Sequence, residues 1–398
     1  MVWDKKMRRV STFAAVAGLM TGAAFVVPAK AADLGGDCCA DLEERVAELE
    51  ATTARKGNRV MSVTVTGRVD EALLMFDTGF DKDTYVVDRG TRLRVEGAGK
   101  VRPDVKLGFR IEIKTRPGDA GSVKTKDTFD FANFSVGDVY WYADSATLGR
   151  LTVGNTSGSM DNVNIVNLAG SIFDGDPKNP AGSLEWSENI AGVAVETGTA
   201  VKKVLGQVAG AGGNMVRWDS PTVANAIGFS ASWGQDDVWG VSAIYGQEFN
   251  GVKVAATAAY EVEDNQANSG ANNELKKTLI SGSILHVPSG VYLSAHWGSQ
   301  EQAGANAGEH VYVHGGVAKD FFGVGQTDIY AEYADSKNFG SINGSAAEGK
   351  MWGIGLEQTI SAASSIAYLN YRNHSATNLA ADDINDVTTF IGGVRVKF

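Results

Sequence analysis

Five basic residues occur at spacings that would place their side chains together on one wall of a β-sheet. Alternate residues of a β-strand point to the same side, and Arg92 and Arg94, like Arg110 and Lys114, are an even number of positions apart. Like charges that face water together create an electric field for passing ions and polar solutes. This chemistry is electrostatic and needs neither proton transfer nor a covalent intermediate. The basic set is Arg68, Arg92, Arg94, Arg110 and Lys114.

Acidic residues occur in a different part of the chain, between Thr156 and Gly212, where no stretch reads as a bilayer-spanning strand. A connection of this length without regular structure is usually functional. Carboxylates from this segment that faced the basic wall across water would create a field that orients polar solutes and disfavours apolar ones. The candidate acids are Asp161, Asp174, Asp176 and Glu185.

Signals for catalysis, metals and cofactors are weak. No Gly-x-Ser-x-Gly nucleophile elbow occurs, and Gly97-Ala-Gly-Lys100 lacks the spacing and the Ser/Thr of a phosphate-binding loop. His310 and His314 share a strand face, but roughly 13 Å of strand separates them, too far to bind one metal ion without a bend. We therefore expect no enzyme, no metal site and no cofactor, with a protease or phospholipase as the remaining enzymatic alternative.

A period of two residues dominates the chain from Val60 onward. In residues 104–115 and again in residues 252–263, apolar side chains alternate with charged or small ones. One apolar face and one charged face suit lipid outside and water inside a barrel. The strands predicted from this pattern are 60–75, 90–101, 104–115, 130–143, 148–155, 213–219, 227–234, 238–249, 252–263, 275–287, 291–300, 310–321, 326–337, 349–360, 364–375 and 387–398.

These strands number sixteen, and bacterial single-chain barrels have an even number. Short connections alternate with longer polar ones, and each proline after residue 31 falls in or beside a connection, where its missing N–H breaks no strand pairing. The longer connections include 264–274, 301–309, 338–348 and 376–386. The predicted fold is all-β: a 16-stranded antiparallel transmembrane β-barrel over residues 60–398, in contact with outer membrane lipid.

The N-terminal region predicts export followed by a short helix. A basic head is followed by an apolar stretch and then by Ala29-Lys30-Ala31, a small-x-small cleavage site. This order is typical of a signal peptide over residues 1–31. Residues 32–59 form a periplasmic segment, in which 41–56 predicts a short helix with Leu42 and Leu49 on one stripe. A coiled coil would bury that stripe, while a frayed linker is the alternative. Cys38 and Cys39 could cross-link neighbouring chains, could pair elsewhere, or could have no role.

The last strand alternates up to the final residue of the sequence. Its first face consists of apolar residues and glycine, and bacterial outer-membrane barrels end in such a strand with a terminal Phe. We therefore expect this strand to be the signal that the barrel assembly machinery reads. The apolar residues of the signal are Phe390, Val394, Val396 and Phe398.

The charge balance excludes one class of partner. The chain has 36 basic and 47 acidic residues, a net charge of −11. Nucleic-acid binding needs clustered positive charge on a basic domain, so no nucleic acid partner is expected.

Several motifs in this order resemble the general porins, most closely the alphaproteobacterial general porin family. They are the leader, the short helix, Leu148-Gly-Arg-Leu-Thr-Val-Gly-Asn155 before the long connection, Met215-Val-Arg-Trp-Asp-Ser-Pro221 after it, and the Phe398 terminus. The resemblance covers essentially the whole exported chain. It implies that 156–212 is a third loop folded into the pore, and that the barrel forms a homotrimer in the bacterial outer membrane.

Together these observations predict a water-filled channel for passive diffusion of small hydrophilic solutes and ions. Two alternatives stay open: a channel specific for a sugar or an anion, and a plugged barrel with a structural or adhesive role. Ion selectivity also stays open, because the net acidity and the basic wall favour opposite ions.

Overall fold

The computed structural model describes residues 60–115, 134–161, 163, 166–173, 175–235, 237–264, 274–302, 306–378 and 383–398. The predictions about the signal peptide, the 41–56 helix, Cys38, Cys39 and Asp174 lie outside these residues. Within the described part, no helix is long and apolar enough to cross a membrane.

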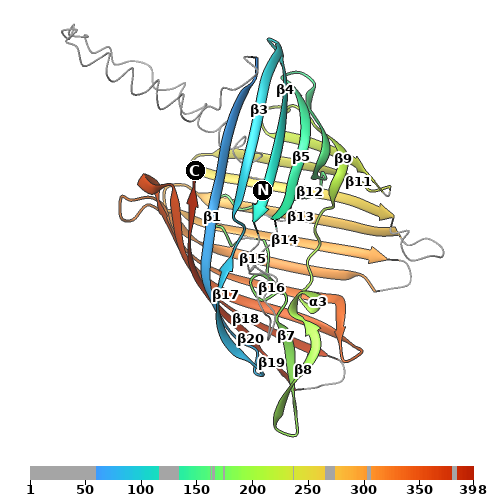
Figure 1. Ribbon diagram of the computed structural model, residues 1–398, viewed down its shortest axis with the longest axis vertical. Coiled ribbons are helices and arrows are strands. Elements are labelled where there is room, and N and C mark those ends of the chain that lie inside the picture. The colour runs from blue at the N-terminus through green and yellow to red at the C-terminus, as the bar shows by residue number, and fades with distance from the viewer. Residues whose placement is uncertain are drawn as a thin grey trace.

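One antiparallel sheet of 17 strands forms the wall of the molecule (Figure 1). Its strands are β1 (Ser62–Asp77), β2 (Lys82–Asp88), β3 (Arg92–Arg102), β4 (Val105–Thr115), β5 (Phe134–Ser145), β6 (Gly149–Ser157), β9 (Gly212–Asp219), β10 (Ile227–Gly234), β11 (Trp239–Phe249), β12 (Val252–Asp264), β13 (Glu274–His286), β14 (Val291–Gln302), β15 (Gly308–Lys319), β16 (Thr327–Ile342), β17 (Ser345–Ile360), β18 (Ser365–Asn378) and β20 (Val387–Lys397).

The sheet is a closed barrel of sixteen spanning strands. β2 pairs with one half of β1 and β3 with the other half, so these two segments together form a single spanning strand. The last strand, β20, pairs with the first, β1, from Arg68↔Lys397 to Asp77↔Thr388. Closure leaves no unpaired sheet edge, as a spanning β-structure requires in lipid. The predicted fold class is confirmed.

The two faces of each strand have opposite environments. In β1, Ala72 and Leu74 are buried, whereas Leu73 and Met75 between them are 51% and 47% exposed. The exposed face of the barrel is apolar along most strands, while polar side chains gather on the inner face. This is the reverse of a soluble sandwich and matches a barrel with lipid outside.

The predicted strands agree with the observed ones to within a few residues, with two differences. The strand predicted at 90–101 is preceded by β2, which extends it beyond a break at residues 89–91. The connection predicted at 338–348 is wrong: β16 and β17 continue to a tight turn at Asn343 and Gly344, with φ of 51° and 77°. Positive φ at both positions suits a two-residue hairpin. The polar residues at these strand ends lack the apolar alternation of the lipid-facing segments, which is why the sequence predicted a loop.

Residues 158–211, called the third loop from here on, connect β6 to β9 without joining the barrel sheet. The loop contains β7 (Glu185–Ile190), β8 (Val193–Ala200) and α3 (Val201–Val204), and β7 also pairs with β19 (Ile384–Asn385) in a separate three-stranded sheet. In Figure 1 the β7–β8 hairpin lies at one end of the barrel. A single-turn η2 helix (Ser361–Ala363) connects β17 to β18 at the opposite end.

Candidate functional site

The five predicted basic residues lie together on the inner face of β1, β3 and β4. Strand register places Arg92 opposite Lys114 and Arg94 opposite Glu112, while Arg68 pairs with Arg92 across β1 and β3. Nε of Arg68 and Nε of Arg92 both donate to the carbonyl oxygen of Gly90, at 2.9 and 3.1 Å. The alternation of β-strands therefore brings this set together, as the sequence indicates.

Carboxylates of the same wall neutralise part of this positive charge. Glu112, buried on β4, pairs with Arg94 and lies 3.6 Å from Arg92 and 3.4 Å from Lys114. A single carboxylate is thus shared by three cations. Such a surplus of like charge is tolerable where water or further counter-charges compensate.

A second group of charges on this wall surrounds Arg110. Its guanidinium pairs with Glu96 of β3 and with Asp138 of β5, 3.2 Å away. Beside it, the guanidinium carbon of Arg150 lies 3.7 Å from the ring centroid of Tyr142. Arg150, Asp138 and Tyr142 were not among the sequence-predicted residues, although their even spacing from strand neighbours on the inner face was available as a signal.

The predicted loop acids are distributed along the third loop. Asp161 lies near its start and Glu185 begins β7, both half-buried. The Asp176 carboxylate lies 3.5 Å from Nζ of Lys178, on the same loop. The structure thus places Asp161, Asp176 and Glu185 on the loop and shows Asp176 paired with a loop lysine.

Inward-facing polar side chains of β10 to β18 hold the backbone of the third loop. For example, Leu168 N–H donates to Ser283 Oγ at 3.1 Å, and Ile172 N–H to Glu357 at 3.0 Å. Near the loop's end, Ser336 Oγ–H donates to Gly206 O at 2.9 Å. The loop therefore lies against the wall opposite β3 and β4. Sequence reasoning missed these contacts because the partners are far apart along the chain.

The third loop has an apolar core of its own. Trp186, Leu184, Val204 and Leu205 are fully buried and pack in one cluster with wall residues that include Met351. Burial of this kind is the largest favourable contribution to ordering a long connection. It explains how a loop of this length keeps a fixed path.

Four of the five histidines line the wall behind the loop. His310 Nδ1 accepts a hydrogen bond from Val208 N–H at 3.2 Å, and His374 Nε2 lies 3.2 Å from Pro177 O. His314 Nε2 lies 2.8 Å from the Tyr292 hydroxyl. Among the described residues no group of three or more His, Cys, Asp or Glu side chains could hold a metal ion. These histidines bind neighbouring protein groups.

The loop also contacts the wall on the side of the barrel closure. The guanidinium carbon of Arg89, at the break between β2 and β3, lies 3.8 Å from the Phe173 ring centroid and 4.9 Å from that of Tyr368 on β18. Phe173 packs edge-on against Tyr368, with 5.4 Å between the centroids. These contacts connect the loop to β18 and to the break between β2 and β3.

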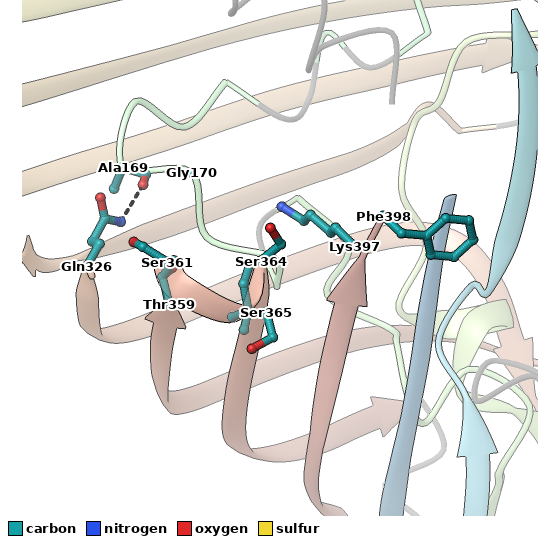
Figure 2. A pocket seen from close by; sticks show the side chains of 10 residues that line it. Ala169, Gly170, Gln326, Thr359, Ser361, Ser364, Ser365, Lys397 and Phe398 are labelled. Carbon is teal, nitrogen blue, oxygen red and sulfur yellow. Dashed lines mark hydrogen bonds between the residues drawn. The ribbon is translucent and has the colours of Figure 1, made fainter. Parts of the chain in front are cut away.

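A cavity of about 580 Å³ lies between the loop and the end of the barrel that contains Lys397 and Phe398. Ala169 and Gly170 of the loop form one side, and hydroxyl side chains of the β17–β18 connection line the other. Figure 2 shows Gln326 reaching Ala169, with 2.8 Å between Nε2 and the carbonyl oxygen, while Lys397 and Phe398 point to opposite sides of their strand.

The predicted assembly-signal residues share the outer face of β20. Phe390, Val394 and Val396 are 40%, 46% and 44% exposed, and Phe398 is 61% exposed. The Phe398 backbone exchanges two hydrogen bonds with Gly67 of β1. The final residue therefore takes part in barrel closure.

Comparison with known proteins identifies the family. Residues 14–379 match the Gram-negative porin family. The anion-selective porin from Comamonas acidovorans is 13% identical with a TM-score of 0.55, covering 85% of this chain and all of that one. A variant of the Rhodopseudomonas blastica porin is 14% identical with a TM-score of 0.52, covering 84% of this chain and 100% of that one. No curated protein matches the sequence.

Identities this low show a shared fold, whereas the family match spans most of the chain. The family match agrees with the closed sixteen-stranded barrel, the apolar outer face and the charged inner wall. The chain belongs to the Gram-negative porin family and is a diffusion channel of the bacterial outer membrane.

Proposed function

We propose that solutes cross the barrel between the third loop and the wall formed by β1 and β3 to β6. One observation carries this path: the loop backbone hydrogen-bonds to the opposite wall, whereas the inner charges of β3 and β4 pair with one another. The basic lining would be Arg68, Arg92, Arg94, Arg110 and Lys114, with the carboxylates of the loop on the other side. Small hydrophilic solutes and ions pass without catalysis, and a cofactor has no part in the process.

The wall field is mixed in sign, which supports a general channel. Glu96, Glu112 and Asp138 lie among the basic residues, so both cations and anions find a partner along the wall. Local charges decide selectivity because screening limits interactions to about 8–10 Å. Asp161, Asp176 and Glu185 are partly exposed on the loop, which supports the proposal that the loop acids, Asp174 included, add cation sites.

An anion-preferring channel is the second candidate. Three cations surround the single carboxylate of Glu112, and one of the structurally similar proteins is described as an anion-selective porin. Selectivity for anions would follow if the loop acids lie too far from the narrow point to balance this surplus.

A homotrimer is the proposed assembly, and the chain's own surface supports it. Glu71 points outward from β1, opposite Val394 of β20, on an otherwise apolar face. A carboxylate facing lipid is unfavourable, and polar groups of a neighbouring protomer would remove that cost. We therefore place the contact between protomers on the β20–β1 side. Placement in the alphaproteobacterial branch, recognition of β20 by the barrel assembly machinery, and a periplasmic 41–56 helix are part of the same proposal.

Conductance of purified, unheated protein in a planar bilayer under a salt gradient tests this function. Large steps that occur in threes would support an open trimeric channel, and the reversal potential would distinguish the general channel from the anion-preferring one. A protein that is folded, as judged by the mobility of unheated samples, but never conducts would contradict the proposal and favour a plugged barrel.

A further inference from the structure

The side chain of Arg372 on β18 uses all of its donors in one buried cluster. The side chain is 1% exposed, and two of its N–H groups bind Glu332 of β16, with Nε–Oε1 at 2.8 Å and Nη2–Oε2 at 2.7 Å. The other three bind backbone carbonyl oxygens of the third loop: Phe173 at 3.0 Å, Asp176 at 2.7 Å, and Asn179. Arginine has five donors, and each has an acceptor here.

We propose that Arg372 is the positioning residue that shapes the loop turn to which Phe173, Asp176 and Asn179 belong, and thereby sets the width of the channel. This inference depends on the proposed path between the third loop and the basic wall. Arg372 does not line that path itself, because it is buried behind the turn. It acts through the loop backbone, which curls around its guanidinium.

The partner carboxylate is itself fixed. Glu332 is fully buried and also accepts hydrogen bonds from Asn370 Nδ2 at 2.9 Å and from the Tyr312 hydroxyl at 2.8 Å. Buried polar groups without partners are costly, whereas satisfied networks define one geometry. Glu332 therefore fixes the orientation of the guanidinium relative to β16.

Two further side chains, Arg89 and His374, contact the turn from other sides. Arg89 stacks on the Phe173 ring at 3.8 Å, and His374 Nε2 lies 3.2 Å from Pro177 O. Cationic or ring groups thus contact the turn from two walls, with Arg372 at its centre. A change at Arg372 moves the backbone that all of these groups contact.

The remainder of the loop has independent anchors. The backbone N–H groups of Leu168 and Ile172 donate to the side chains of Ser283 and Glu357, and the Ser336 hydroxyl donates to the Gly206 carbonyl oxygen. Loss of Arg372 therefore frees the turn while the loop as a whole stays against its wall. The expected consequence is a channel of altered width in a barrel that still folds.

Two variants separate the geometry of the guanidinium from its charge. Arg372→Lys keeps one positive charge beside Glu332, but an ammonium group lacks the planar fork and two of the five donors. The double variant Arg372→Met with Glu332→Gln removes both charges, so no unpaired buried carboxylate remains. Agreement between the two variants assigns the effect to the lost loop contacts.

Arg395 provides a matched control. It is a buried arginine on the inner face of the neighbouring strand β20, and it binds Asp70 through Nε at 2.7 Å and Nη2 at 2.6 Å. Arg395→Lys makes the same chemical change at a carboxylate pair between two barrel strands. It should leave the loop turn in place.

The experiment compares these full-length proteins in two measurements. Planar-bilayer conductance with neutral polyethylene glycols of graded size gives the exclusion size of the channel. Backbone hydrogen exchange followed by mass spectrometry gives the protection of residues 173–179 without requiring an open channel. Unheated gel mobility checks that each barrel is folded.

For both Arg372 variants we expect a changed exclusion size and at least about a tenfold loss of exchange protection in 173–179, with neither change in the Arg395 control. A tenfold change corresponds to about 1.4 kcal/mol, within reach of three lost hydrogen bonds. Unchanged exclusion size and protection in folded variants would overturn the inference. A wild-type protein without conductance would instead contradict the proposed function, and exchange in 173–179 would then decide the role of Arg372 alone.

Discussion

Arg110 of β4 forms an ion pair with Asp138 of β5, with 3.2 Å between Nη1 and Oδ2. Both residues belong to the inner wall, so the barrel itself supplies a counter-charge to its basic residues. The prediction from sequence placed the acidic residues that face the basic wall on the third loop only. Selectivity should therefore respond to the acids of this wall as well as to those of the loop.

Neutralising Glu112 should make the channel more permeable to anions. Glu112→Gln leaves the charges of Arg92, Arg94 and Lys114 without their shared carboxylate. Two unit charges about 4 Å apart in water interact by about 1 kcal/mol, so a several-fold change in the permeability ratio is expected. The reversal potential under a potassium chloride gradient measures it.

The double variant Arg92→Ala with Arg94→Ala should shift the reversal potential in the opposite direction. Glu348→Gln is a suitable control, because Glu348 is exposed on β17. Glu348→Gln should leave the reversal potential unchanged. If Glu112→Gln or the arginine double variant also gave the wild-type reversal potential, Glu112 or the two arginines would not lie at the narrow point.

Acidification should loosen the third loop near Val208. His310 Nδ1 can accept the Val208 N–H bond only while that nitrogen carries no proton. The bond is therefore present at higher pH and is lost once acid protonates the ring, at a cost of about 1 kcal/mol. The measurement is open-channel noise as a function of pH.

His310→Gln should reduce this pH dependence, because an amide oxygen can accept the same bond at any pH. His286, which is exposed at the end of β13, provides the control: His286→Gln should keep the wild-type profile. Identical pH profiles for the His310 variant and wild type would show that His310 does not sense protons.

Removal of Trp186 should destabilise the third loop without unfolding the barrel. Its side chain is fully buried, and Trp→Ala in such a site costs about 3–5 kcal/mol. Lys202 and Lys203 are exposed in α3, so a loosened loop should be cut by trypsin near these residues.

The rate of this cleavage is the measurement, with Trp233→Ala as the control on the outer face, where Trp233 is 60% exposed. Equal resistance to trypsin in the Trp186 variant and wild type would mean that the apolar cluster does not hold the loop.

Substitution of Gly67 should weaken closure of the barrel. A Cβ at this position would clash with Cζ of Phe398 and would lie 2.6 Å from the carbonyl oxygen of Arg92. Gly67→Val should therefore cost about 1–3 kcal/mol by overpacking. The temperature at which the folded band disappears on a gel is the measurement.

Gly282 in β13 provides a matched control, because a Cβ there would meet its nearest atom at 3.5 Å. A Gly282→Val barrel should melt close to wild type. Equal melting of the two valine variants would contradict a special role for the contact between Gly67 and Phe398.

The amino-acid sequence by itself determined the barrel. Lipid on one side and water on the other impose a two-residue period on each spanning strand, and this period is visible without knowledge of neighbouring strands. The same rule placed Arg92, Arg94 and Arg110 on one inner wall. It failed at 338–348, where β16 and β17 continue with polar residues and lack that period.

Only the tertiary structure decided the path of the third loop and the groups that hold it. Arg372 and Glu332 are 40 residues apart, and Arg372 is 199 residues from its acceptor Phe173. Such contacts depend on strand register and on burial of residues such as Trp186, which follow no local pattern. The wall residues could be predicted because strand alternation depends only on neighbouring residues of the sequence. The path of the loop could not be predicted, because it depends on contacts between residues far apart in the sequence.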